Sequence, residues 1–175
     1  VLYKRPRYQF RLREAISKVY PGLYEYILLD CPPAIAPLTL NALAAADLII
    51  IPAQTELYAA QSLRQTVKLA VQMREQCNPN LDYRVLVTMY DMRNKINRMI
   101  LEQMKSELGQ LLFETIIQID TKLRESPAYG KPITSYARKT RSAQQYRALA
   151  QEILKPEIAQ MLQRREAEAS ECDDG

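Results

Sequence analysis

The residue of this sequence with the clearest chemical potential is Asp30, which ends the apolar run 24–30 and precedes a cysteine, Pro32 and Pro33. A run that is apolar on both faces predicts a buried parallel strand. A carboxylate at the end of such a strand is costly to desolvate, so we expect Asp30 at the open end of a sheet. There it could hold hydrated magnesium beside a nucleotide phosphate. A helix N-cap or a plain strand-end carboxylate explains the same pattern.

Three more loops follow predicted strands and are therefore candidates for a binding site. They are residues 52–54, 88–91 and 118–120. Ligands of open parallel sheets bind at the carboxyl ends of the strands, so polar residues in these loops are expected to meet at one edge. The loop after Asp30 is stiffened by its two prolines, which also lack backbone donors.

The composition excludes several kinds of chemistry for this chain. It contains no histidine, which rules out serine triads, cysteine–histidine nucleophiles and histidine-ligated zinc. Its three cysteines are odd in number and widely spaced, which favours a reduced cytosolic protein over a disulfide framework. With no base predicted nearby, Cys31 is expected to be a small buried residue rather than a nucleophile. No apolar run approaches the ~20 residues of a membrane helix.

Helices and strands are predicted to alternate along the chain, which favours an α/β fold with a mostly parallel sheet flanked by helices. Apolar spacing of three and four residues predicts helices, and short apolar runs predict strands. The predicted helices are 8–19, 38–46, 57–77, 95–108 and 142–154, and the predicted strands are 24–30, 47–52, 83–90 and 112–119. Gly109 is the expected C-cap of the fourth helix, and residues 129–132 are an expected tight turn.

The charge is unevenly distributed. The net charge is +4, yet five of the 20 acidic residues lie in the last ten positions, so residues 1–165 carry 24 basic and 15 acidic side chains. A basic body suggests a polyanionic partner. The polar, acidic segment 166–175 is predicted to be disordered.

Several ordered motifs resemble those of the ParA/Soj partition ATPases, deviant P-loop proteins related to MinD. Residues 30–33 resemble the family's D-x-P-P, 38–47 its L-T-x-N-A-L-x-A-A-D and 51–59 its I-P-x-Q-x-E-x-Y-A. Further similarity, covering most of the chain between roughly residues 10 and 154, occurs in residues 78–80, 86–93, 123–133 and 146–154.

The chain departs from this family in one important respect. The family's phosphate loop, K-G-G-x-G-K-T/S, is absent, as is its second acidic motif, and the chain has four glycines in all. The resemblance therefore implies that residues 1–165 are the C-terminal portion of a P-loop NTPase-like domain whose N-terminal strands are missing. Without nested N–H groups and a lysine for the phosphates, no residue of this chain is expected to be catalytic, and it should not hydrolyse ATP alone.

The resemblance implies roles in binding ATP and magnesium. Asp30 would hold magnesium through water, and Pro32 and Pro33 would couple the γ-phosphate to dimerisation. The loop that encloses the adenine would include Thr88, Met89 and Asp91. The family's Pro-Arg pair is replaced by Gln118 and Ile119, which alters the expected base pocket.

The resemblance also implies partners: a homodimer that binds DNA without sequence preference, and a ParB-like protein that triggers hydrolysis during chromosome or plasmid partitioning. The matching DNA-binding positions are Arg93 and Lys122, whereas Lys95 and Arg98 could simply solvate a helix face. The protein would be cytoplasmic and nucleoid-associated. No membrane partner is expected, because the acidic tail lacks a basic amphipathic helix.

Two other interpretations stay open at this stage. The chain could be a non-hydrolysing DNA- or partner-binding module derived from the same family. It could also lack a stable fold by itself, since losing a central strand leaves strand edges unpaired and apolar faces bare.

Overall fold

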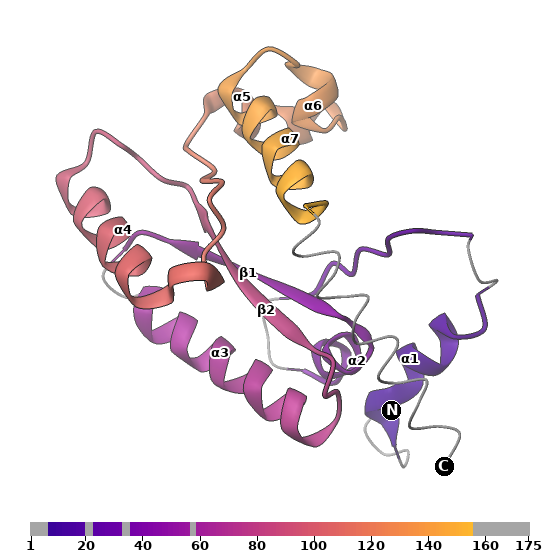
Figure 1. Cartoon of the computed structure of the whole chain (residues 1–175). Helices are drawn as coiled ribbons and strands as arrows, with labels where there is room; N and C mark the ends of the chain where they lie inside the picture. The colour runs from indigo at the N-terminus through magenta and orange to yellow at the C-terminus, as the bar shows by residue number, and fades with distance from the viewer. Residues whose placement is uncertain (1–6, 20–22, 33–35, 57–58, 156–175) are drawn as a thin grey trace. The chain divides into compact units, whose positions relative to one another are not determined.

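The computed structural model of the protein describes residues 7–19, 23–32, 36–56 and 59–155. The chain divides into two compact units, residues 1–49 with 67–82 and residues 50–66 with 83–175, and each is described by itself. In chain order the helices and strands are the 3-10 turn Tyr8–Phe10, α1 Arg11–Ile16, α2 Pro37–Ala45, β1 Leu48–Gln54, α3 Ala59–Gln76, β2 Asp82–Thr88, α4 Lys95–Leu108, the 3-10 turn Gly109–Leu111, α5 Thr121–Glu125, the 3-10 turn Ser126–Tyr129, α6 Ile133–Tyr136 and α7 Arg141–Ile153 (Figure 1).

The predicted α/β architecture is confirmed. Strands β1 and β2 pair in a small sheet, and the helix α3 connects them. A third segment joins β2 on its other side through the parallel bridges Val85–Leu112 and Tyr90–Gln118. The predicted helices are all found within a few residues of their expected bounds, except that the first is shorter and begins as a 3-10 turn.

The first unit is built around residues that the apolar pattern brings inward. Its buried core consists of Leu43, Ala44, Met73 and Leu81, and the half-buried residues packed against it include Phe10, Ile49 and Leu69. The side-chain amide of Asn78, which follows α3, donates to the carbonyl oxygens of Leu43 at 2.9 Å and Ala46 at 2.7 Å. These carbonyls lie at the C-terminal end of α2, where the helix itself supplies no donors.

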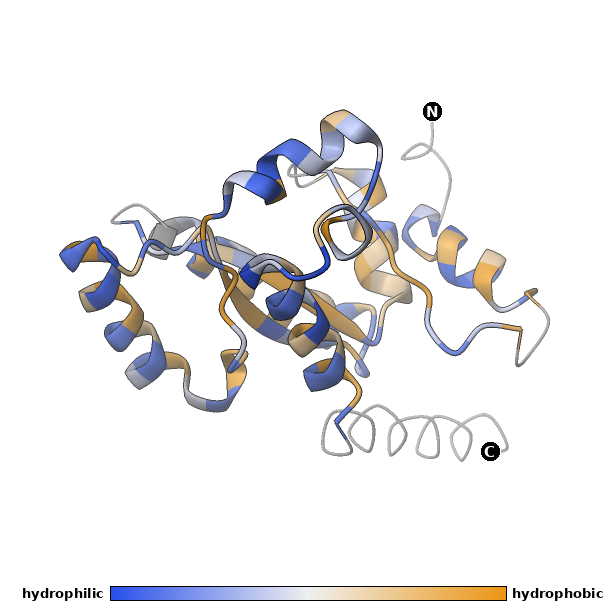
Figure 2. Cartoon of the chain, turned by 90° about the horizontal axis from the view of Figure 1, so that it is seen from above, coloured by the Kyte–Doolittle hydropathy of each residue, from blue (hydrophilic) through white to orange (hydrophobic). Residues whose placement is uncertain are grey.

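The strand predicted over residues 24–30 does not form. The run Ile27–Leu29 is coil, drawn in orange in Figure 2, and Leu28 is 91% exposed. An apolar run becomes a strand only where a neighbouring strand supplies hydrogen-bond partners, and the described residues provide no such ladder for this run. Asp30 is consequently exposed, and so is Cys31, which corrects the expectation of a buried cysteine.

The second unit has its own core at the sheet. The buried residues are Ala53, Val85, Val87, Tyr90, Leu101 and Leu112, with Leu63, Met104, Leu108 and Ile116 packed against them. Helix α4 begins at Asn94, whose side chain accepts from the N–H of Ile96 at 2.9 Å. It ends at Gly109, which has a φ of 53° as its predicted capping role requires.

The strand predicted over residues 112–119 is interrupted. The N–H groups of Phe113 and Ile117 donate to the β2 carbonyls of Val85 and Val87, but between them the chain bends at Glu114. The N–H groups of Glu114 and Thr115 donate instead to the carboxylate of Glu152 on α7, at 2.6 and 2.9 Å. The carboxylate of Glu152 thus takes the place of strand carbonyls as hydrogen-bond acceptor for these two N–H groups. The segment therefore forms isolated parallel bridges and no continuous ladder.

The region after this segment contains short helices that the apolar pattern does not predict. Helices α5 and α6 have five and four residues, and the side chain of Asp120 caps α5 by accepting from the N–H of Lys122 at 2.9 Å. The expected tight turn at residues 129–132 is found, with Gly130 left-handed at a φ of 60°. The tail 166–175 lies outside the described residues. Within the described part, none of the helices is long and apolar enough to cross a bilayer.

Candidate functional site

The loops that follow β2 and the 112–119 segment lie side by side, as the sequence predicted. The N–H of Tyr90 donates to the carbonyl of Ile117 at 3.2 Å, and the N–H of Ile119 donates back to Tyr90 at 3.1 Å. Met89 turns the chain out of β2 with a φ of 55°, a conformation that a non-glycine residue rarely adopts. The two loops are therefore held in register at the carboxyl ends of their strands.

These loops border an open, mostly polar hollow of about 520 Å³. Its walls come from the loop after β2, the loop before α5 and the starts of two helices. The lining residues are Tyr90, Asp91, Met92, Arg93, Gln118, Ile119, Asp120, Thr121, Arg124 and Arg141. Three arginines and two aspartates thus line one hollow, although they come from three separate segments of the chain.

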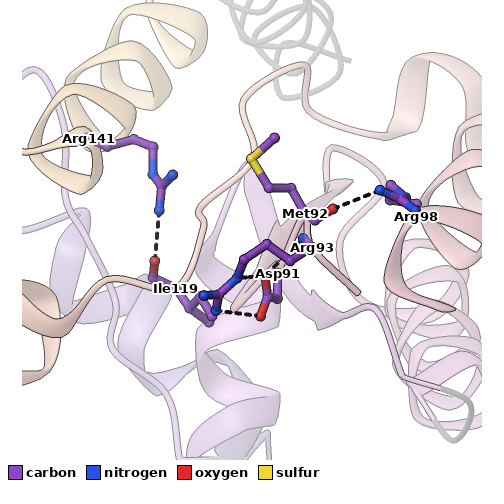
Figure 3. A network of polar contacts seen from close by, with 6 residues as sticks. All are labelled: Asp91, Met92, Arg93, Arg98, Ile119 and Arg141. Atoms are coloured by element: carbon purple, nitrogen blue, oxygen red, sulfur yellow. Dashed lines mark hydrogen bonds and ion pairs between the residues drawn. The ribbon is translucent and has the colours of Figure 1, made fainter. Parts of the chain in front are cut away.

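Asp91 and Arg93 form a two-pronged ion pair within the first of these loops. The carboxylate oxygens of Asp91 accept from Nε of Arg93 at 3.0 Å and from Nη2 at 2.9 Å, and from its backbone N–H at 3.0 Å. The hydrogen bond to Arg93 lowers the pKa of Asp91 and raises that of Arg93. Figure 3 shows the Arg93 side chain folded back onto Asp91, although the side chain as a whole stays 80% exposed.

Asp120 connects the second loop to α7. Its Oδ2 accepts from the hydroxyl of Ser142 at 2.9 Å, while Oδ1 caps α5. Burial alone would raise the pKa of Asp120, but the hydrogen bonds from Ser142 and the Lys122 N–H, with the charge of Arg141, outweigh it and lower the pKa. Arg141 itself donates to the carbonyl of Ile119 at 3.1 Å (Figure 3).

This pKa shift gives a testable pH dependence. A carboxylate whose pKa is lower in the folded state adds stability above its unfolded pKa of about 3.9 and loses it as the pH falls through the folded value. Asp120→Asn still caps α5 but removes the charge, so its melting temperature should lie below wild type at pH 7 and approach wild type near pH 3. Thermal melts at both pH values test this; a gap that stays constant would show that the charge contributes nothing.

Only some of the predicted nucleotide-site residues lie at the hollow. Asp91 lines the hollow, and Thr88 and Met89 lie directly before it at the end of β2. Asp30 and Pro32 are exposed residues of the first unit. Pro33 lies outside the described residues.

The two predicted DNA contacts are both exposed and both paired with acids. Arg93 lines the hollow with Asp91 as its partner. The ammonium of Lys122 lies 2.7 Å from the carboxylate of Glu125, which also accepts from the hydroxyl of Tyr136 at 3.1 Å. Because of this pairing, the pKa of Lys122 is raised and that of Glu125 is lowered. Any phosphate that binds these cations must compete with a carboxylate.

Sequence reasoning missed Arg124 and Arg141. Arg124 lies in the five-residue helix α5 and Arg141 begins α7, and only the fold brings them to the hollow that Arg93 also lines. The available signal was the local charge, since residues 91–147 contain eleven basic and six acidic residues. The excess indicated a basic surface without indicating which cations share a site.

The described residues do not form a metal site built from protein ligands alone. They contain no group of three cysteine, aspartate or glutamate side chains close enough to share an ion. Magnesium in nucleotide sites, however, usually keeps several waters and takes one or two carboxylates together with the phosphates. A single exposed carboxylate such as Asp30 fits that second arrangement.

A small parallel sheet flanked by helices makes this an α/β protein, and its fold matches solved structures of P-loop, ParA-like proteins. Among solved structures, cobyrinic acid a,c-diamide synthase from Mycobacterium smegmatis matches with a TM-score of 0.65 and 28% identity, covering 87% of this chain and 56% of the synthase. Other crystal structures of that enzyme contain magnesium with ADP or with an ATP analogue.

Sequence relatives narrow the class. A family model described as an AAA domain matches residues 1–83. Chromosome partitioning protein ParA of Myxococcus xanthus is 38% identical over 160 residues, which cover 91% of this chain and 56% of the relative. Sporulation initiation inhibitor protein Soj of Bacillus subtilis is 36% identical over 146 residues, which cover 83% and 57%. The chain belongs to the ParA/Soj family of partition ATPases, and it spans just over half the length of these relatives.

Proposed function

We propose that this chain forms the DNA-binding and adenine-side part of an ATP-dependent partitioning switch. The whole protein would dimerise on binding ATP and magnesium, bind DNA without sequence preference and release it when a ParB-like partner triggers hydrolysis. The observation that carries the proposal is the pair of strand-end loops, 88–93 and 117–121, held together around an open hollow with three arginines. The names of the relatives, among them chromosome partitioning protein ParA of Myxococcus xanthus, support partitioning as the process.

The nucleotide part of the proposal rests on loop position. Adenine would lie against the loop Thr88–Asp91, whose Met89 offers an exposed apolar side chain beside polar backbone groups. Asp30 would hold magnesium through water, and the ion would neutralise phosphate charge when bound. Pro32 and Pro33 would form the stiff connection between this carboxylate and a dimer partner.

The DNA part of the proposal rests on exposed cations. Arg93 is held by Asp91 yet remains 80% exposed, so a phosphate can reach the guanidinium from the solvent side. Lys122 is about half exposed beside Glu125. Exchanging a carboxylate for a DNA phosphate keeps each cation paired and releases counterions from the duplex.

Titration of the 175-residue chain with two labelled duplexes of unrelated sequence tests this function. We expect equal affinities and a linear fall of log K with log salt concentration. Arg93→Gln should reduce the steepness of that fall by about one unit for both duplexes, because one phosphate contact is lost. Lys105→Gln, which removes an exposed charge from α4, is the matched control. Absence of binding at low salt, or a strong preference for one duplex, would contradict non-specific DNA binding.

A further inference from the structure

Arg93, Arg124 and Arg141 come from three separate segments and line one hollow. The two aspartates of the same hollow do not neutralise them equally. Asp91 is committed to Arg93 through two side-chain hydrogen bonds. Asp120 is committed to Ser142 and to the N–H of Lys122.

The positive charges of Arg124 and Arg141 are not paired with a carboxylate of the described residues. In the part of the chain that the structure describes, neither forms an ion pair with a carboxylate. Arg141 donates one hydrogen bond, to the neutral carbonyl of Ile119, and both side chains belong to exposed residues. An exposed guanidinium that has no anion partner retains donors for a phosphate.

From this placement we infer that Arg124 and Arg141 bind backbone phosphates of duplex DNA at the rim of the hollow, beside Arg93. The inference rests on the proposed DNA-binding function and names contacts that the family resemblance does not supply. Arg93 must release Asp91 before it binds a phosphate fully, whereas Arg124 and Arg141 need no such exchange. Arg124 and Arg141 therefore contribute more to the first encounter with DNA.

The duplex is favoured over a small anion by the form of the site. The hollow is open and its arginines are exposed, so a bound group stays accessible and can be part of a long chain. Consecutive phosphates of one strand offer partners to more than one guanidinium at a time.

The test is the salt dependence of duplex binding by the full 175-residue chain carrying Arg124→Gln together with Arg141→Gln. Loss of two phosphate contacts should lower the salt slope by about two units, which corresponds to roughly 60-fold weaker binding at about 0.1 M salt. The Lys105→Gln, Lys155→Gln variant removes the same charge from two exposed ion pairs elsewhere and should lose far less. The Arg124→Lys, Arg141→Lys variant keeps both charges and should retain the wild-type slope.

The outcomes separate this inference from the function on which it rests. If wild type binds no duplex at low salt, both fail. If wild type binds but the double glutamine variant keeps its slope, or the control loses as much, only the assignment of Arg124 and Arg141 is overturned. Circular dichroism melts of each variant check that the fold is retained. Binding of poly-glutamate that depends on these arginines, with duplex binding unaffected, would assign the rim to an acidic protein partner and would also overturn the inference.

Discussion

Replacing Glu152 with alanine is expected to lower the free energy of unfolding by about 2–4 kcal/mol, one of the two largest effects on stability that the structure predicts. Glu152 is 8% exposed, and its two carboxylate oxygens accept from the consecutive N–H groups of Glu114 and Thr115. Alanine leaves both donors without a partner at the point where the segment departs from β2. A loss of this size should reduce the melting temperature by roughly 5–15 °C.

Two controls separate the loss of the two Glu152 hydrogen bonds, called the Glu152 clamp below, from a general effect of changing an acid. Glu152→Gln keeps one acceptor oxygen and should lose less stability than alanine. Glu107→Ala removes an exposed glutamate on α4 and should change stability by no more than about 0.5 kcal/mol. Urea unfolding followed by circular dichroism measures all three. A Glu152→Ala protein as stable as Glu107→Ala would mean that water satisfies the two N–H groups and that α7 does not hold the segment.

The clamp explains why the 112–119 strand could be predicted only in part. The apolar run correctly indicated a segment beside β2, which the parallel bridge Val85–Leu112 confirms. The interruption depends on Glu152, which lies 38 residues after Glu114 and 37 after Thr115. No local sequence pattern predicts a contact over that separation. The side chain of Gln145 adds to it by accepting from the N–H of Gln118 at 3.1 Å. Side chains of one helix thereby substitute for a neighbouring strand.

The failure over residues 24–30 has a different cause. Composition can show that a run is apolar enough for burial, but pairing depends on which strands are available. In the described structure the run has no ladder, and Tyr24 and Leu28 are 64% and 91% exposed. The helices α3, α4 and α7 were predictable because their apolar spacing is repeated over several turns. Helices α5 and α6 are too short for such a period, and their ends are set by Asp120 and Pro132 instead.

The candidate site shows the same division between local and long-range information. Asp91 and Arg93 are two residues apart, so the sequence could indicate them together. Arg124 and Arg141 reach the hollow because Asp120 connects α5 to Ser142 at the start of α7. That connection joins side chains 22 residues apart, so a search for local sequence motifs cannot predict it.

Asn78→Ala is expected to destabilise the first unit by about 2–3 kcal/mol, because it removes two hydrogen bonds and leaves two carbonyl oxygens near the end of α2 without their donor. Asn78 is 3% exposed, so water cannot easily replace it. The backbone N–H of residue 78 donates to the carbonyl of Met73 at 2.8 Å at the end of α3, and the substitution keeps this hydrogen bond, so the loss reports the side-chain amide. Thermal melts followed by circular dichroism measure the loss.

An isosteric variant distinguishes hydrogen bonding from packing at this position. Asn78→Asp keeps the shape of the side chain but places a carboxylate oxygen against the carbonyls of Leu43 and Ala46, so it should destabilise at least as much as alanine. Gln72→Ala, at an exposed position on the same part of α3, should stay within about 0.5 kcal/mol of wild type. If Asn78→Asp melts like wild type, the amide is not donating to α2. The connection between α2 and the end of α3 would then depend on the apolar contacts of Leu43 and Met73 alone.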